Sequence, residues 1–166
     1  MSRSDQGNTK DRYTVIPRTA IFLQRGGSYL LLKGAPTKRL WANKYNGLGG
    51  HVERGEDVLF AAKRELLEET GLSADLWLCG TVIVDAGETG ICLYIFSGEC
   101  LEGEPQPSKE GLAEWIQFEN IGNLPIVEGL ANNTYLPLAG YNEQANMIGR
   151  ITRKVGQCHA NLVFTS

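Results

Sequence analysis

The segment GGHVERGEDVLFAAKRELLEETGL, residues 49–72, decides the fold of this chain. After two glycines and a short polar stretch, residues 57–70 contain neither Gly nor Pro and are rich in helix-forming residues. Asp57 places an acid in the first turn, and Gly71 stands where a left-handed residue commonly ends a helix. The pattern predicts a helix over residues 57–70.

Three glutamates of this predicted helix fall on one face. Each helical residue turns about 100°, so Glu65, Glu68 and Glu69 lie within an arc of roughly 100°. Like charges at this spacing repel by roughly a few tenths of a kcal/mol per pair. A divalent cation removes this repulsion, and Mg²⁺ or Mn²⁺ prefers oxygen ligands that substrate phosphates often complete. The face indicates either a metal site for a phosphorylated substrate or a solvated face on which Arg64 pairs with Glu68.

The neighbouring residues favour the metal site. Val58, Ala62 and Leu66 form an apolar row beside the acids, which predicts that the acids lie at the edge of the buried surface. Gly49 and Gly50 allow the backbone to approach a ligand closely, since they carry no side chain.

The rest of the chain is predicted to be mainly strands, with this one strong helix in the middle. Two strands joined at Gly26-Gly27 precede the helix. Further elements follow it: strands at 76–85, 90–100 and 113–118, a helical or loop segment near 123–140, and a closing strand at 160–164. This arrangement is typical of an α+β fold with helices packed on a mixed sheet.

The spacing of the polar residues resembles the Nudix box, G-x5-E-x7-R-E-U-x-E-E-x-G-U, in which U is apolar. Every fixed position is matched by Gly50, Glu56, Arg64, Glu65, Leu66, Glu68, Glu69, Gly71 and Leu72. The Nudix family hydrolyses nucleoside diphosphates linked to another group and uses Mg²⁺ or Mn²⁺. The resemblance implies this activity and the family's α+β fold, a mixed sheet sandwiched between α-helices.

The resemblance also implies roles for the matched residues. Glu68 and Glu69 resemble the metal ligands of the family, and Glu65 resembles a ligand that also orients or deprotonates the attacking water. Gly49 is expected to offer its carbonyl to the cation. Arg64 is expected to hold the glutamates in place by pairing with them, so that its loss would impair activity.

Two further acids extend the predicted site. Glu56 is expected to support the loop and helix or to contact the metal through water. Many family members recruit another glutamate from a later loop, and Glu110, five residues before Trp115, stands at the usual place, although a solvated loop position is the alternative. The other candidates are Glu99, Glu102, Glu104 and Glu114.

The segment KYNGLGGHVE, residues 44–53, resembles the WNGxGGxVExGE segment of MutT-type 8-oxo-dGTP diphosphatases. In that subgroup an asparagine at the position of Asn46 reads the purine, whereas a turn asparagine before Gly47 is the alternative reading. The aromatic residue before Asn46 is Tyr45 rather than Trp, and Trp41 comes four residues earlier.

Other residues complete the predicted substrate site. Lys33, Lys38 and Arg39 are candidates for phosphate contacts, with solvated loop positions as the alternative, and Arg18 is a candidate for phosphate or base contacts. Glu128 is the nearest acid for binding a modified base, but asparagines at 132 and 133 stand where the subgroup has acids. The leading interpretation is hydrolysis of a purine or modified-purine nucleoside triphosphate to monophosphate and pyrophosphate. ADP-ribose, a dinucleoside polyphosphate and a non-catalytic nucleotide-binding domain are the alternatives.

Composition argues against several other classes of protein. A formal net charge of −3 gives no basic footprint for a nucleic-acid polymer. No apolar run approaches the ~20 residues of a membrane span. The N-terminus has no apolar signal-peptide core, so a cytoplasmic location is expected. Residues 1–12 are predicted to be a disordered lead-in and residues 13–166 a single domain, for which a homodimer, common in the family, is left open.

Overall fold

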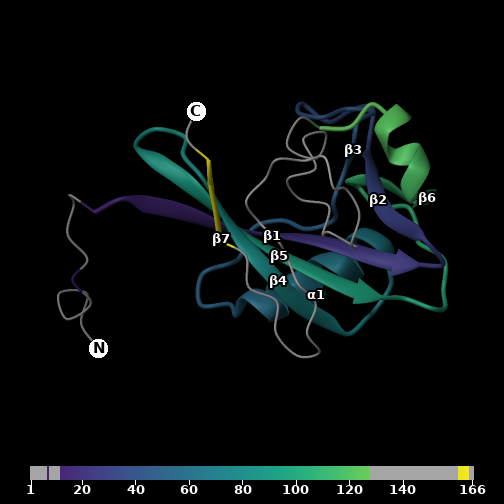
Figure 1. Cartoon of the computed structure of the whole chain (residues 1–166), viewed down its shortest axis with the longest axis horizontal. Helices are drawn as coiled ribbons and strands as arrows, with labels where there is room; N and C mark the ends of the chain where they lie inside the picture. The colour runs from purple at the N-terminus through teal and green to yellow at the C-terminus, as the bar shows by residue number, and fades with distance from the viewer. Residues whose placement is uncertain (1–6, 8–11, 128–160, 165–166) are drawn as a thin grey trace.

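A seven-stranded sheet and one α-helix make up most of the part of the chain that the structure, a computed structural model, describes: residues 7, 12–127 and 161–164. The elements follow the predicted order (Figure 1). They are β1 (Thr14–Arg25), β2 (Ser28–Gly34), β3 (Tyr45–Asn46), α1 (Val58–Thr70), β4 (Leu76–Val84), β5 (Thr89–Glu99), β6 (Gly111–Gln117), the 3-10 helix η2 (Phe118–Asn123) and β7 (Asn161–Phe164).

Both ends of α1 are capped. The Asp57 carboxylate accepts hydrogen bonds from the backbone N–H groups of Leu59 (2.9 Å) and Phe60 (3.2 Å), so Asp57 is the N-cap and not a member of the first turn. At the other end Gly71 adopts φ 72°, and its N–H donates to the Leu67 carbonyl at 2.8 Å. An N-cap of this kind contributes about 1 kcal/mol. The two caps fix which residues are helical and hence where the glutamates point.

The sheet is mixed and built around β1. On one side β1 runs parallel to β5, which is antiparallel to β4, and β4 in turn is parallel to β7. On the other side β1 pairs with β2 only where their hairpin closes, at Gln24 with Tyr29 and Arg25 with Ser28. β2 then diverges to pair with β3 and β6 (Figure 1). The predicted α+β fold with a mixed sheet is confirmed.

The edge of β1 that β2 leaves open is used by residues 48–52. Backbone N–H groups of β1 donate to this segment, Ile21 to the Leu48 carbonyl and Thr19 to the Gly50 carbonyl, both at 2.8 Å. The glycines that begin the box are therefore fixed against the middle of the sheet. α1 begins at Val58, after residues 51–57.

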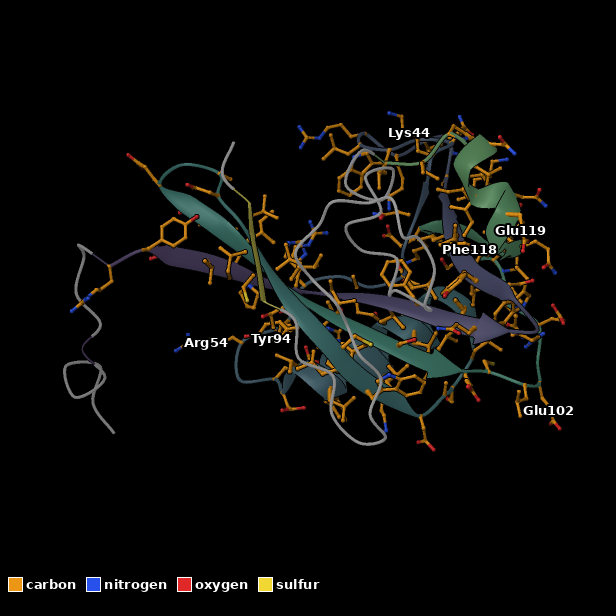
Figure 2. The ribbon with its side chains drawn as sticks, viewed as in Figure 1. Lys44, Arg54, Tyr94, Glu102, Phe118 and Glu119 are labelled. Atoms are coloured by element: carbon orange, nitrogen blue, oxygen red, sulfur yellow. The ribbon has the colours of Figure 1, made fainter. Side chains whose placement is uncertain are left out.

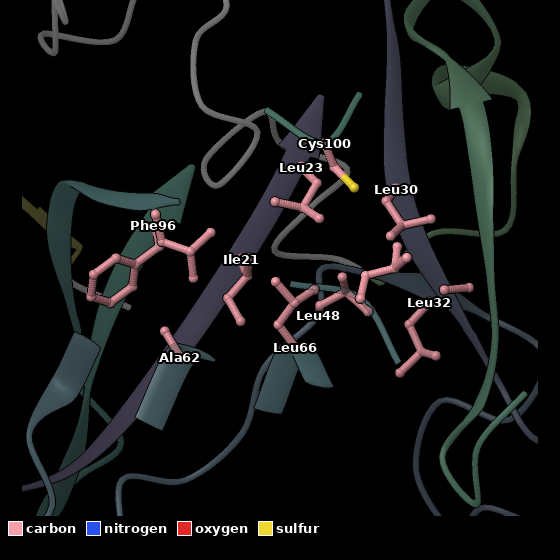
Figure 3. Close-up of a cluster of buried hydrophobic side chains, with 12 residues drawn as sticks. Ile21, Leu23, Leu30, Leu32, Leu48, Ala62, Leu66, Phe96 and Cys100 are labelled. Carbon is pink, nitrogen blue, oxygen red and sulfur yellow. The ribbon is translucent and has the colours of Figure 1, made fainter. Parts of the chain in front are cut away.

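The core lies on both faces of β1, because residues 20–23 are all buried and alternate between two clusters. On one face Ile21 packs with Ala62 and Leu66 of α1 (Figure 3). Full burial of a leucine such as Leu66 stabilises the fold by about 2 kcal/mol. The opposite face of the sheet carries the cluster around Phe22. The apolar row predicted on the helix is therefore its buried side.

Several predictions concern parts of the chain outside the described residues. They include nearly all of the lead-in at 1–12, most of the segment near 123–140, and the base-binding candidate Glu128. Among the described residues α1 is the one α-helix, and the second helical layer implied by the family fold is not seen among them. Within the described ranges, no helix combines the length and apolar character needed to cross a membrane.

Candidate active site

A cleft of about 880 Å³ lies beside the glutamates of α1. Its lining combines acidic and basic side chains with exposed backbone. The acids are Glu53, Glu65, Glu68, Glu69 and Glu110, and the basic residues are Arg18, Lys38, Lys44, His51 and Lys109. Gly49 and Gly50 contribute backbone, and Asn46 and Trp41 contribute groups able to contact a base. Such a lining suits a ligand that carries both phosphates and a heterocycle.

The three box glutamates differ in their exposure. Glu69 is only 5% exposed, and its Oε2 accepts a hydrogen bond of 2.8 Å from the Gly49 N–H. The Glu65 side chain is 16% exposed and the Glu68 side chain is 60% exposed. The acidic face thus crosses from the core to the solvent, as the adjacent apolar row predicts.

Arg64 connects these acids to the loop before the helix. Its Nε and Nη2 donate to the two oxygens of Glu56, at 2.8 and 2.9 Å, in a bidentate pair. Its Nη1 donates to Glu65 at 2.9 Å and to Glu68 at 3.3 Å, and Nη2 also donates to the His51 carbonyl at 3.1 Å. The pairings place Arg64 where it can orient both the helix and the glycine segment.

Glu56 is held as a carboxylate by this arrangement. The hydrogen bonds from Arg64 lower its pKa to about 2, and the backbone N–H of Glu53, which donates to Glu56 Oε2 at 2.9 Å, adds to the effect. The pKa of Arg64 is correspondingly raised, chiefly by Glu56. Glu56 therefore remains charged throughout the neutral range and joins the loop to Arg64 of α1, whereas its alternative role, contact with a metal through water, stays a prediction.

Glu69 is perturbed in the opposite direction. Its pKa is raised to about 8, mainly by burial; the neighbouring carboxylates of Glu65 and Glu110 add to the rise, and the Gly49 N–H and Lys38 oppose it. A buried carboxylate facing other carboxylates needs a proton or a cation to neutralise it. Carboxylate oxygens without sulfur or imidazole ligands suit a hard divalent cation, so the residues present fit Mg²⁺ or Mn²⁺.

The carboxylates are not gathered around one point. Among the described residues, no group of three or more His, Cys, Asp or Glu side chains is arranged to hold a metal ion. Glu65 and Glu68 turn toward Arg64, and Glu69 turns toward the Gly49 N–H. These side chains would have to rotate before they could share a cation.

The two glycines of the box serve different purposes. Gly49 has φ 122°, and a Cβ there would overlap the Thr19 carbonyl. A Cβ on Gly50 would instead overlap the carboxylate of Glu65. Gly49 is thus required by the backbone, whereas Gly50 leaves the space that the Glu65 side chain occupies.

Replacing Gly50 with Ala is expected to displace the Glu65 carboxylate while leaving the fold intact, because that side chain can rotate. Turnover should fall by roughly 10- to 100-fold, as for other changes that misplace a metal-site ligand. Gly49→Ala should instead lower Tm, because the strain is in the backbone. Measuring kcat and Tm for both variants checks this, and wild-type turnover in Gly50→Ala would contradict a role for Glu65 in the reaction.

Most of the predicted site residues come together in the cleft. Arg18, Asn46, Gly49, Glu65, Glu68, Glu69 and Glu110 all line it, and Arg64, also on α1, pairs with Glu65 next to it. Lys33 is absent from the described lining. In the ladder between β2 and β3, Leu32 pairs with Asn46 and both reach the cleft, so Lys33 and its partner Tyr45 face the other way. The Lys33 Nζ accordingly lies 5.6 Å from the centre of the Tyr45 ring.

The alternative later glutamates have other positions. Glu114 accepts a hydrogen bond of 2.5 Å from the Tyr45 hydroxyl, which is the main cause that raises the pKa of Tyr45 to about 12. Glu104 pairs with Arg25 at 3.0 Å. Glu102 lies at the opposite end of the molecule from Arg54, the neighbour of the cleft residue Glu53 (Figure 2). Among the five candidates, all within the described residues, Glu110 is the one that lines the cleft.

Two cleft lysines, Lys44 and Lys109, were not predicted. They come from the loops before β3 and before β6, which meet because β2 and β6 pair up to Gly34 and Gly111. The Ala35 N–H also donates to the carbonyl of Glu110 at 2.9 Å. No local pattern marks these lysines, since their position depends on strand pairing between distant parts of the sequence.

Comparison with known proteins identifies the family. The NUDIX domain model matches residues 15–135. An oxidized purine nucleoside triphosphate hydrolase from Danio rerio is 38% identical over 106 residues, which cover 62% of this chain and 67% of the relative. The Mus musculus protein of the same name is 37% identical over 94 residues, which cover 55% of this chain and 60% of the relative. The chain therefore belongs to the Nudix hydrolase family.

Within that family the chain is similar to MutT-type proteins. The crystal structure of a MutT protein from Methanosarcina mazei Go1 superposes with a TM-score of 0.63, at 22% sequence identity, over 73% of this chain and 91% of that chain. This likeness confirms the fold predicted from the box.

Proposed function

We propose that this Nudix hydrolase cleaves a purine nucleoside triphosphate to a monophosphate and pyrophosphate, with the help of Mg²⁺ or Mn²⁺. The observation that carries the proposal is the cleft in which four glutamates, Glu65, Glu68, Glu69 and Glu110, are combined with basic side chains and Asn46. The names of the two relatives, both oxidized purine nucleoside triphosphate hydrolases, support a purine triphosphate as substrate.

The cation would be held by Glu65, Glu68 and Glu69, with Glu110 and the Gly49 carbonyl as further ligands. When bound, it would neutralise charge on the triphosphate oxygens, which would favour attack by water at phosphorus and stabilise the departing pyrophosphate or nucleotide. Arg18, which has no ion-pair partner among the described residues, is available for a phosphate or the base.

Glu65 is assigned to orienting the attacking water. Its Oε1 is held by Arg64 at 2.9 Å, while Oε2 has no hydrogen-bond partner among the described residues. One oxygen thus fixes the side chain and the other is available as an acceptor. Arg64 acts through Glu65 and Glu68 and is a positioning residue.

Asn46 and Trp41 are assigned to the base. The Asn46 Oδ1 accepts a hydrogen bond of 2.9 Å from the Gly47 N–H, so its amide nitrogen remains available to donate to a purine edge. Trp41 lines the cleft and is 42% exposed, whereas Tyr45 is buried and donates to Glu114. Trp41, and not Tyr45, therefore offers a ring on which a base can stack.

The reaction is tested by a substrate panel that contains purine, oxidised purine and pyrimidine triphosphates, ADP-ribose and a dinucleoside polyphosphate. The expected products from a purine triphosphate are the monophosphate and pyrophosphate, identified by mass. Orthophosphate as the first product would contradict the proposal, and a clear preference for ADP-ribose or the dinucleoside compound would replace it with one of those activities.

Base recognition is tested by Asn46→Ala. Loss of one hydrogen bond to the base should lower kcat/KM for purine triphosphates by about tenfold, while the values for pyrimidine triphosphates change less. Glu65→Gln is the matched comparison, because it should slow all substrates alike. An unchanged purine preference in Asn46→Ala would remove Asn46 from the base site.

A further inference from the structure

Lys38 and Glu110 form an ion pair that joins two loops of the cleft. Lys38 lies between β2 and β3, Glu110 stands directly before β6, and both side chains line the cleft and are partly exposed. The backbones of these loops are already held together by the pairing of Gly34 with Gly111 and by the Ala35–Glu110 hydrogen bond. The ion pair is therefore not needed to keep the loops in place, and its partners are free to exchange.

Lys38 differs from the other cationic side chains of the cleft. Arg18, Lys44 and Lys109 have no ion-pair partner among the described residues, whereas Lys38 is bound to the later glutamate that the proposed function assigns to the cation. The cleft therefore contains several unpaired basic side chains and one, Lys38, whose charge is balanced by the carboxylate of Glu110.

The charges of Lys38 and Glu110 also affect Glu69, the buried glutamate of α1. Glu110 raises the pKa of Glu69 and Lys38 lowers it, so both groups lie within electrostatic reach of its carboxylate. A divalent cation that binds Glu69 and Glu110 would take over the neutralising role of the ammonium group and would also repel it.

We propose that Lys38 is an internal counter-ion for Glu110 which a divalent cation displaces, and that the released ammonium group then binds a substrate phosphate. The inference rests on the proposed function, since it requires a cation and a phosphorylated substrate. The long flexible side chain of lysine can move from one partner to the other without a backbone change. Lys38 thus competes with the cation in the empty cleft and contributes to substrate binding once the cation is present.

The first test measures Mn²⁺ binding without nucleotide, from the electron paramagnetic resonance signal of free Mn²⁺. Lys38→Met should bind Mn²⁺ roughly threefold to tenfold more tightly than wild type, because the competitor for Glu110 is gone. Lys44→Met is the matched control, since it removes the same charge from the same cleft but breaks no ion pair. Equal gains in the two variants would overturn the proposal.

A double-mutant cycle identifies the partner. Glu110→Gln should weaken Mn²⁺ binding, and in that background Lys38→Met should no longer increase the affinity, because its partner is already neutral. A gain that persists in the Glu110→Gln background would overturn the proposal, since Lys38 would then act only through the general field of the cleft.

The second half of the proposal is tested with the triphosphate. At saturating Mg²⁺, Lys38→Met should raise KM several-fold with little change in kcat, and an unchanged KM would overturn the transfer to phosphate. Wild-type protein that binds no Mn²⁺ would overturn both this inference and the proposed use of a cation. If the protein produces pyrophosphate with normal cation dependence but the double-mutant cycle shows no coupling between Lys38 and Glu110, this inference alone would be overturned.

Discussion

Glu69→Gln is expected to reduce turnover by more than ~100-fold. Loss of a group that only supports a metal ligand typically lowers activity by about 10- to 100-fold, and Glu69 is proposed to be a ligand itself. Gln keeps the shape of the side chain and its hydrogen bond with the Gly49 N–H, but it removes the charge from the most buried of the three box glutamates. The expected loss of activity is therefore chemical and not structural. The measurement is kcat at saturating Mg²⁺, and a value near wild type would make Glu69 a structural residue.

The same substitution is expected to stabilise the cation-free protein at alkaline pH. Burial raises the pKa of Glu69 from the usual 4.5 to about 8 in the folded state, so the folded protein binds this proton more tightly than the unfolded chain does. The associated stabilisation is fully present below pH 4.5 and is lost as the pH rises through 8. Gln carries no such proton, so the stability of Glu69→Gln should decline less over this range.

Glu68→Gln is the matched control for stability. Its side chain is 60% exposed, so its charge is solvated in the folded state and its loss should leave the pH dependence of Tm unchanged. As a proposed ligand it should still slow turnover. Tm values in EDTA at pH 6 and pH 9 for both variants and wild type make the comparison. A wild-type Tm that does not fall relative to Glu69→Gln would contradict the raised pKa.

Removal of divalent cations is expected to abolish turnover almost completely, and Mg²⁺ or Mn²⁺ should restore it. Without a cation, the carboxylates of Glu65, Glu68 and Glu110 would repel the substrate phosphates. Cation binding should also raise Tm, by an amount equivalent to about 2.7 kcal/mol when the free cation is at 100 times its Kd. This rise should be larger at pH 9 than at pH 6, because at pH 6 the cation has to displace a proton from Glu69.

Activity and Tm are measured after dialysis against EDTA and again after each cation is added back. Glu69→Gln provides the control, since its Tm should respond little to Mg²⁺ at either pH. Full turnover in excess EDTA, once bound metal has been removed, would contradict the cation-dependent mechanism.

The helix and its acidic face could be predicted from the sequence because both depend on neighbours in the chain. Asp57, Gly71 and the apolar row fix the ends of α1 and its buried side, and helical spacing then places Glu65, Glu68 and Glu69 together. These are short-range effects, and one sequence contains all the information they need.

The opposite wall of the cleft could be predicted only in part. Lys33 was a reasonable phosphate contact by composition, but the register of β2 with β3 turns it toward Tyr45 and away from the described cleft. The contact between Lys38 and Glu110 arises because β2 and β6 pair, although they are far apart in the sequence. A single sequence carries no signal for this register, since a shift of one residue exchanges which side chains face the ligand.

The early divergence of β2 from β1 separates the box glutamates of α1 from the proposed base-binding residues within one small domain. The glycine segment and α1, which carry the box, rest on β1, whereas Asn46, Trp41 and Lys38 depend on β2 and its partners. Under the proposed function, sequence change in the loop at 35–44 would therefore alter contacts with the base or the phosphates while Glu65, Glu68 and Glu69 keep their positions on α1. In evolutionary terms, the divergence allows new substrates to be acquired without rebuilding the reaction centre.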